Sequence, residues 1–196
     1  MLGREETARS LTAAWWLFLN RPDAMRLFDV SLEGFWRSFA AILLVAPAYA
    51  LTAIAENQAM LTDALPDNGG SGAAYFLDKA LTLGLDWISL PIVLALLARP
   101  LGITRTYSGF VVARNWASVI SILPFAAVAL LYLLGIIDAD LWSFLSLAFI
   151  IVIFRYTFVI ARRALGASLG LAAGLVALDF AVSLALSQGI DALFGM

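Results

Sequence analysis

The chain contains five long runs of apolar residues, and these runs limit what it can fold into more than any other feature. They lie at about residues 35–55, 75–98, 115–137, 141–161 and 167–190. A helix needs about 20 apolar residues to cross a hydrocarbon core of about 30 Å, and each run reaches that length. The sequence therefore predicts an all-α fold, a polytopic membrane bundle of five transmembrane helices.

The composition is that of a membrane protein and argues against several kinds of chemistry. The 196 residues are 63% hydrophobic and 13% charged, whereas soluble domains carry about 25% charged residues. Cysteine and histidine are both absent, which removes thiolate ligands and the commonest general base and metal ligand. Basic residues are also few outside the membrane flanks. We therefore expect no enzyme activity, no cofactor, no metal site and no nucleic-acid partner.

Residues 1–34 are expected to form a cytoplasmic amphipathic segment that precedes the transmembrane domain at 35–196. Apolar and aromatic residues recur there at helical spacing, first around Trp15 and Phe18 and then from residue 25 to residue 39. Runs this short cannot cross a bilayer, and aromatic-rich amphipathic helices of this kind lie in the membrane interface. The segment is therefore predicted to contain one or two interfacial helices.

The basic residues orient the predicted spans. Most of them lie before or at the start of the first span, between the second span and the third, or between the fourth and the fifth. These are Arg4, Arg9, Arg21, Arg26, Arg37, Arg99, Arg105, Arg114, Arg162 and Arg163. Because cytoplasmic loops are rich in Lys and Arg, we expect the N-terminus in the cytoplasm and the C-terminus outside, in a bacterial cytoplasmic (inner) membrane. Arg99, Arg105, Arg162 and Arg163 form the predicted cytoplasmic basic flank.

Three charged residues lie well inside the predicted spans, away from the residues at which the spans begin, and each is costly to place in lipid. They are Asp86, Arg155 and Asp179. A charge at the bilayer centre costs at least about 2.5–3.5 kcal/mol, so such a residue is usually paired or wetted. Arg155 and Asp179 lie at roughly similar depth on neighbouring spans. We expect them to contact each other or to share a polar cluster with Asp86, either as a structural ion pair or as a site that handles protons.

Glycines recur at every fourth residue where the last span begins. They are Gly166, Gly170 and Gly174, and small residues continue the row along the span. Small residues let the backbones of membrane helices approach closely. The row is therefore predicted to be a helix-packing face, primarily within this chain, with homodimerisation as the alternative.

Two sequence patterns imitate catalytic motifs without their context. Residues 166–170 read Gly-x-Ser-x-Gly, but this nucleophile elbow needs a strand-to-helix turn and a histidine partner. Asp86 and Asp179 suggest an intramembrane aspartyl protease, in which two carboxylates share a proton. That family carries Tyr-Asp and Gly-x-Gly-Asp, whereas this chain has Leu-Asp at both positions. Neither pattern changes the expectation that the protein is not an enzyme.

The organisation of the chain resembles that of the Yip family of membrane proteins. The matching features are RPDAMRLF at 21–28, Asn-Trp at 115–116 with Pro124, and RALG at 163–166 before a last span with Ala173 and Asp179. The resemblance implies five packed spans after a cytoplasmic amphipathic segment. It also implies a non-catalytic scaffold or adaptor that acts by packing against protein or lipid partners.

A second function remains open from the same residues. Asp86, Arg155 and Asp179 are also the residues that a small proton-coupled permease would use near the middle of the bilayer. A permease needs a water-accessible cavity at its carboxylates, whereas a scaffold buries them dry and paired. Under either function, the expected partners are the lipid bilayer and a membrane protein or a second copy of this chain.

Overall fold

The computed structural model describes residues 3–62 and 72–194, and within them the chain is helical and contains no strand. The elements are α1 (Arg4–Phe18), η1 (Ala24–Leu27), α2 (Leu32–Ser38), η2 (Phe39–Ala41), α3 (Ile42–Leu61), α4 (Ala73–Leu97), α5 (Tyr107–Leu133), α6 (Ala139–Leu165) and α7 (Leu169–Phe194). The all-α prediction is confirmed. The tip of the predicted loop after the first span lies outside the described residues.

Five stretches are long and apolar enough to cross a membrane, which confirms the predicted number of spans. They cover Leu32–Leu61, Ala73–Leu97, Tyr107–Leu133, Ala139–Leu165 and Leu169–Leu193. The largest difference from the sequence analysis is the third, which begins eight residues before residue 115. The third span can begin before Arg114 and Asn115 because these polar side chains bind partners on other helices. Arg114 binds Asp179, and Asn115 binds Ser38.

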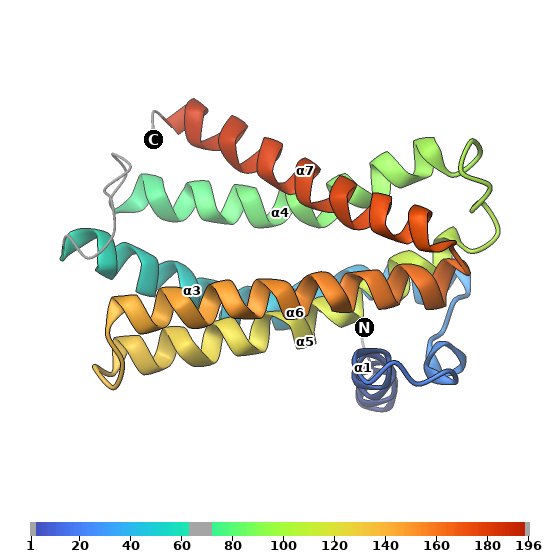
Figure 1. Ribbon diagram of the computed structural model, residues 1–196, viewed down its shortest axis with the longest axis horizontal. Coiled ribbons are helices and arrows are strands. Elements are labelled where there is room, and N and C mark those ends of the chain that lie inside the picture. The colour runs from blue at the N-terminus through green and yellow to red at the C-terminus, as the bar shows by residue number, and fades with distance from the viewer. Residues whose placement is uncertain (1–2, 63–71, 195–196) are drawn as a thin grey trace.

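The long helices run in alternating directions (Figure 1). The N-terminal segment, the connection at 98–106 and the turn at 166–168 lie at one end of the bundle. The turn at 134–138 and the end of α7 lie at the other. The predicted basic flank of Arg99, Arg105, Arg162 and Arg163 is therefore gathered at the end that carries the N-terminal segment. Which side of a membrane this end faces stays a prediction.

Helix α1 lies across the bundle, seen end-on in Figure 1, and packs on α5 and α6. Its buried face is made of small residues and Leu17, while Trp15 on the opposite face is exposed. The Tyr156 hydroxyl of α6 donates a hydrogen bond of 2.6 Å to the carbonyl oxygen of Ala14. A 15-residue helix with this placement is what an interfacial helix requires.

The second interfacial helix predicted for residues 25–39 is interrupted. A short 3₁₀ turn at Ala24–Leu27 leads to an extended segment, and Ser31 then starts α2 by accepting a hydrogen bond of 3.1 Å from the Gly34 backbone N–H. A cap of this kind fixes where a helix begins. From there α2, η2 and α3 form one continuous path into the membrane span.

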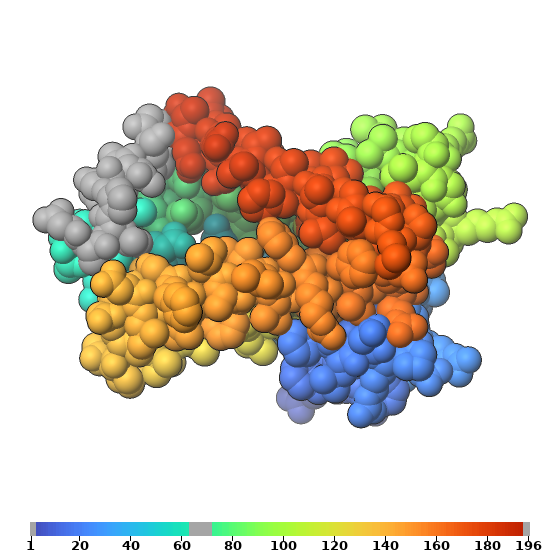
Figure 2. Space-filling view, viewed as in Figure 1, coloured from blue at the N-terminus to red at the C-terminus, as the bar shows by residue number. Residues whose placement is uncertain are grey.

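The helices differ in how closely they pack and in which neighbours they contact. Helix α5 packs closely against α3 and α6, and α1 and α2 close the same body, whereas α4 packs chiefly against α7. In the apolar windows of these spans, 33% of α5 is buried but only 11% of α7. Figure 2 shows a hollow between α6 and α7, away from the N-terminal segment, with α3 and α4 visible at its floor. We call the boundary between α4–α7 and the α3–α5–α6 body the seam.

Candidate functional site

A charged cluster lies in the seam and joins three helices. The Arg114 guanidinium of α5 contacts both Asp179 of α7, with Nη2–Oδ1 at 3.0 Å, and Asp86 of α4, with Nη2–Oδ2 at 3.9 Å. The Ser183 hydroxyl donates a hydrogen bond of 2.5 Å to Asp86 Oδ1. The closest partner of Arg114 is therefore Asp179, while the closest partner of Asp86 is the neutral hydroxyl of Ser183.

The cluster lies well inside the membrane spans. From the nearer helix end, its three residues are about 10–16 Å along the axis at about 1.5 Å per residue. The side chains of Arg114, Asp179 and Asp86 are 12%, 22% and 34% exposed. Asp86 is thus the least enclosed of the three. When all three groups are ionised, two negative charges and one positive charge leave the cluster with a formal charge of −1.

The structure corrects the partner that the sequence analysis assigned to Asp179. Arg155 lies outside the cluster, and its Nη1 donates a hydrogen bond of 3.3 Å to the carbonyl oxygen of Phe18, at the C-terminal end of α1. Arg114 takes its place, and Asp86 and Asp179 meet through it. Sequence reasoning missed Arg114 because it was assigned to a loop. The apolar run FVVA at 110–113, directly before it, was the signal that the helix had already begun.

A cavity of about 220 Å³ opens beside Asp86, and we call it the Asp86 cavity. Polar groups from three helices line it: Tyr49 of α3, Asp86 of α4, and Arg114, Ser118 and Ser121 of α5. Trp87 also lines it, and its buried indole N–H has no hydrogen-bond partner among the described residues. The carboxylate at the seam therefore borders open space and not packed side chains.

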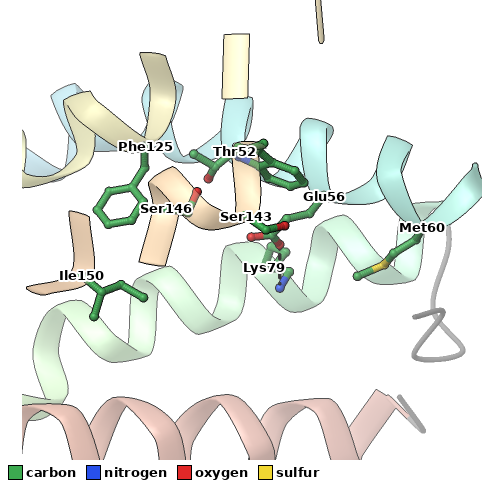
Figure 3. Close-up of a pocket in the computed structure, with 9 residues that line it drawn as sticks. Thr52, Glu56, Met60, Lys79, Phe125, Ser143, Ser146 and Ile150 are labelled. Atoms are coloured by element: carbon green, nitrogen blue, oxygen red, sulfur yellow. Dashed lines mark ion pairs between the residues drawn. The ribbon is translucent and has the colours of Figure 1, made fainter. Parts of the chain in front are cut away.

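A larger cavity of about 400 Å³ lies further along the seam, and we call it the Glu56 cavity. In Figure 3 the side chains of Glu56, Lys79 and Ser143 converge on the same space. Lys79 Nζ lies 3.2 Å from Glu56 Oε2, and the Tyr75 hydroxyl donates a hydrogen bond of 2.8 Å to the same oxygen. Glu56 and Lys79 were expected at or beyond the ends of the spans, but the structure places them inside the helices.

Phe125 of α5 lines both cavities and so lies between them. Lys79 and Asp86 are two helical turns apart on α4, which is about 10 Å along the axis. Thr82, which lies between them on α4, has a buried hydroxyl with no partner among the described residues, and Oδ1 of Asp78, which directly precedes Lys79, is also buried without one. Buried polar atoms nearly always have a partner, protein or water. The seam thus contains two separate cavities with polar groups in their walls, and buried polar atoms on the same stretch of α4 for which water is the expected partner.

The glycine row does not pack within this chain, which overturns the expected intramolecular contact. Gly166, Gly170 and Gly174 are exposed, and a Cβ added at any of them would meet no atom within 4 Å. Gly166 serves instead as the C-cap of α6, with the left-handed φ of 63° that glycine accepts easily. The row faces away from the bundle because α7 contacts α4 and α6 through its other sides.

Comparisons with known proteins identify no relative. No family model, no curated protein and no solved structure matches this chain. The fold itself defines the class: an integral membrane protein with five apolar spans in contact with the lipid bilayer. Among residues 3–62 and 72–194, no three acidic groups gather closely enough to hold a metal ion. The resemblance to the Yip family stays a prediction from the sequence.

Proposed function

We propose that this protein is a small, non-catalytic permease in which protons or a small polar solute move along the seam. The observation that carries the proposal is the unbalanced Asp86–Arg114–Asp179 cluster beside the Asp86 cavity. A buried structural ion pair repays its desolvation only when its charges are matched and its geometry is good. This cluster has one carboxylate too many and adjoins open space, which supports a site that takes up a proton or a cation.

The contacts suggest different roles for the two carboxylates. Asp179 is 3.0 Å from Arg114 and does not line the Asp86 cavity, so it serves as the fixed counter-ion of the arginine. Asp86 is 3.9 Å from Arg114, lines the cavity and receives only a hydroxyl hydrogen bond besides. We therefore propose Asp86 as the group that binds and releases the proton.

The route would continue from Asp86 to the Glu56 cavity. Both cavities border α3, α4 and α5, and Phe125 separates them. A small shift of the loosely packed α4–α7 pair, or a rotation of the Phe125 ring, would connect the two spaces. With the N-terminus in the cytoplasm, as the arginine distribution predicts, the Glu56 cavity would lie toward the outside.

A scaffold remains the second candidate, and a separate observation favours it. One face of α7 exposes Gly170, Ala173, Gly174 and Ala177, a surface of small residues that suits close approach of another membrane helix. A scaffold of the Yip type would use such a face to pack against a protein partner or a second copy. It would not need Asp86 to exchange protons with water.

A pH step applied to proteoliposomes on a solid-supported membrane tests the permease without requiring the solute. Proton binding to Asp86 inside the membrane should displace charge and give a transient current. The current should disappear in Asp86→Asn and persist in Asp140→Asn, which changes an exposed carboxylate at the start of α6. Gel filtration of each variant checks folding. A wild-type protein with no current, or an Asp86→Asn current equal to wild type, would contradict the proposal.

A further inference from the structure

Three arginines of α6 have no carboxylate partner among the described residues, although each lies near or within a membrane span. Their hydrogen bonds go mainly to backbone carbonyls: Arg155 to Phe18, Arg162 to Ala167, and Arg163 to Asn20 at 3.2 Å, with a second bond of 2.9 Å to the Asn20 side chain. All three are exposed. Each guanidinium has five N–H donors, so these contacts leave positive charge and free donors on the surface.

The three arginines lie along one side of α6, the side that faces α1. Arg162 and Arg163 follow Arg155 by seven and eight residues, which is about two turns of helix, and Val152 lies one turn before Arg155 on the same side. The stretch from residue 152 to residue 163 is about 16 Å long. The bonds from Arg155 and Arg163 to the end of α1 and the following loop show that this side borders the N-terminal segment. We call it the arginine strip.

Each end of the arginine strip adjoins a hollow of different chemistry. At the helix end, a cavity of about 240 Å³ is lined by Asn20, Phe158, Val159, Arg162 and Arg163. At the other end, an apolar groove of about 300 Å³ runs between α1, α5 and α6, lined by residues that include Trp15, Phe18, Leu123, Phe149, Val152 and Ile153. Arg155 lies on α6 between the two hollows. Charged at one end and apolar at the other, the strip has the polarity of a phospholipid.

We propose that the arginine strip binds an anionic phospholipid from the leaflet at this end of the bundle. The phosphate would lie against Arg162 and Arg163, where guanidinium groups match phosphate oxygens in charge and geometry. An acyl chain would run along α6 past Arg155 into the groove beside Trp15 and Phe18. The negative headgroup also explains how exposed arginines without carboxylates are tolerated in this part of the membrane. The proposal does not depend on transport.

Lipid-dependent thermal stability of the detergent-solubilised, delipidated protein tests this site. Dioleoyl phosphatidylglycerol should raise the Tm more than dioleoyl phosphatidylcholine does. Arg162→Gln/Arg163→Gln should weaken the apparent affinity for phosphatidylglycerol by about fivefold for each arginine removed. Arg105→Gln removes an exposed arginine from the same end of the bundle and should leave the affinity unchanged.

Two further arms separate lipid binding from a general loss of structure. Arg162→Lys/Arg163→Lys keeps both charges and should retain most of the preference for the anionic lipid. Trp15→Ala should reduce the advantage of dioleoyl over dihexanoyl phosphatidylglycerol, because it opens the chain groove. Equal stabilisation by the two dioleoyl lipids would overturn the proposal. Equal stabilisation by inorganic phosphate, or an Arg105→Gln effect as large as that of the double glutamine variant, would overturn it as well.

Discussion

The body, formed by α3, α5 and α6 with α1 and α2 packed on it, differs in its packing from the seam beside α4 and α7. In the body, Phe110, Trp116 and Tyr156 are almost fully buried, and the Tyr156 hydroxyl finds a carbonyl oxygen. In the seam, charged groups border two cavities and α4 leaves buried polar atoms without partners among the described residues. The body is packed around a large apolar core, whereas the seam places charged groups beside its cavities.

This difference indicates that stability and function are assigned to different regions of the bundle, with α5 contributing residues to both. Close packing of apolar side chains stabilises a membrane protein even where no water is expelled, through van der Waals contacts. Regions that bind or move are drawn from the less tightly packed parts of a fold. We therefore expect substitutions in the body to change stability first, and substitutions in the seam to change proton binding first.

The largest loss of stability is expected from Trp116→Ala in the body. Trp116 is 2% exposed, and truncating a buried tryptophan costs about 3–5 kcal/mol through lost contacts and the cavity left behind. Phe125→Ala, in the seam, should cost less than half as much because its ring already borders two cavities. Unfolding in mixed micelles measures both free energies. Equal costs would remove the distinction between the two regions.

Removing Arg114 should have the next largest effect, because it leaves two carboxylates without a counter-ion. Breaking a buried pair from one side costs about 3–5 kcal/mol, and the partial exposure of this cluster places Arg114→Leu near the lower end. Arg114→Leu/Asp179→Leu should be less destabilised than the sum of its single variants. Arg155→Leu and Asp179→Leu should add, since these residues do not touch. If the Arg155 and Asp179 substitutions were coupled and the Arg114 and Asp179 substitutions were additive, Arg155 and not Arg114 would be the partner of Asp179.

Two glycine substitutions contrast the packed N-terminal segment with the open face of α7. A Cβ at Gly34 would lie 2.2 Å from the Asp29 carbonyl oxygen, so Gly34→Ala should cost about 1–3 kcal/mol as the backbone moves. Gly170→Leu meets nothing within 4 Å, so the stability of the monomer should change by no more than about 0.5 kcal/mol. Folded yield and Tm test both. A severe Gly170→Leu defect, with a changed oligomeric state, would favour the scaffold.

The smallest effect is a pH dependence in the N-terminal segment. Hydrogen bonds from the Ser31 side chain and backbone, with help from Arg37, lower the pKa of Asp29 below its usual value. A carboxyl group with a lowered folded pKa stabilises the fold above its unfolded pKa, and this contribution is lost as the pH falls through the folded pKa. The difference in Tm between wild type and Asp29→Asn should therefore be present at neutral pH and shrink below about pH 4. A difference that stays constant with pH would contradict this role.

The parts of the fold that follow from helix length and polarity could be read from the sequence. The five spans needed only a count of apolar residues, and Asp86 and Asp179 were visible as charges inside them. Arg114 was placed in the connection before the third span because it is charged and stands next to a polar residue, Asn115. The apolar run FVVA at 110–113 indicates that the helix has already begun, but only the structure identifies the partner of Arg114 on α7. Arg155 was paired by depth alone, but depth does not say which side of α6 it faces.

The packing of the last helix lay beyond the sequence for a related reason. Gly170 and Gly174 mark a face on which a helix can approach, but they do not identify what approaches it. In the structure α7 turns that face outward and presents Asp179 and Ser183 to α4 and α5. The cavities were equally invisible, because each depends on gaps between side chains of helices that are distant in the sequence.

The central claim, that the seam is open to water while the body is dry, can be tested most directly by cysteine labelling. The chain has no cysteine, so each variant carries a single thiol. Ser121→Cys and Ser143→Cys line the two cavities, Ala117→Cys is buried in the body, and Ala177→Cys lies on the outer face of α7. A thiol reacts with a water-soluble methanethiosulfonate as the thiolate, which requires water. In proteoliposomes we expect the two cavity thiols to react at least about tenfold faster than the other two. Cavity thiols that react no faster than Ala117→Cys would contradict the account.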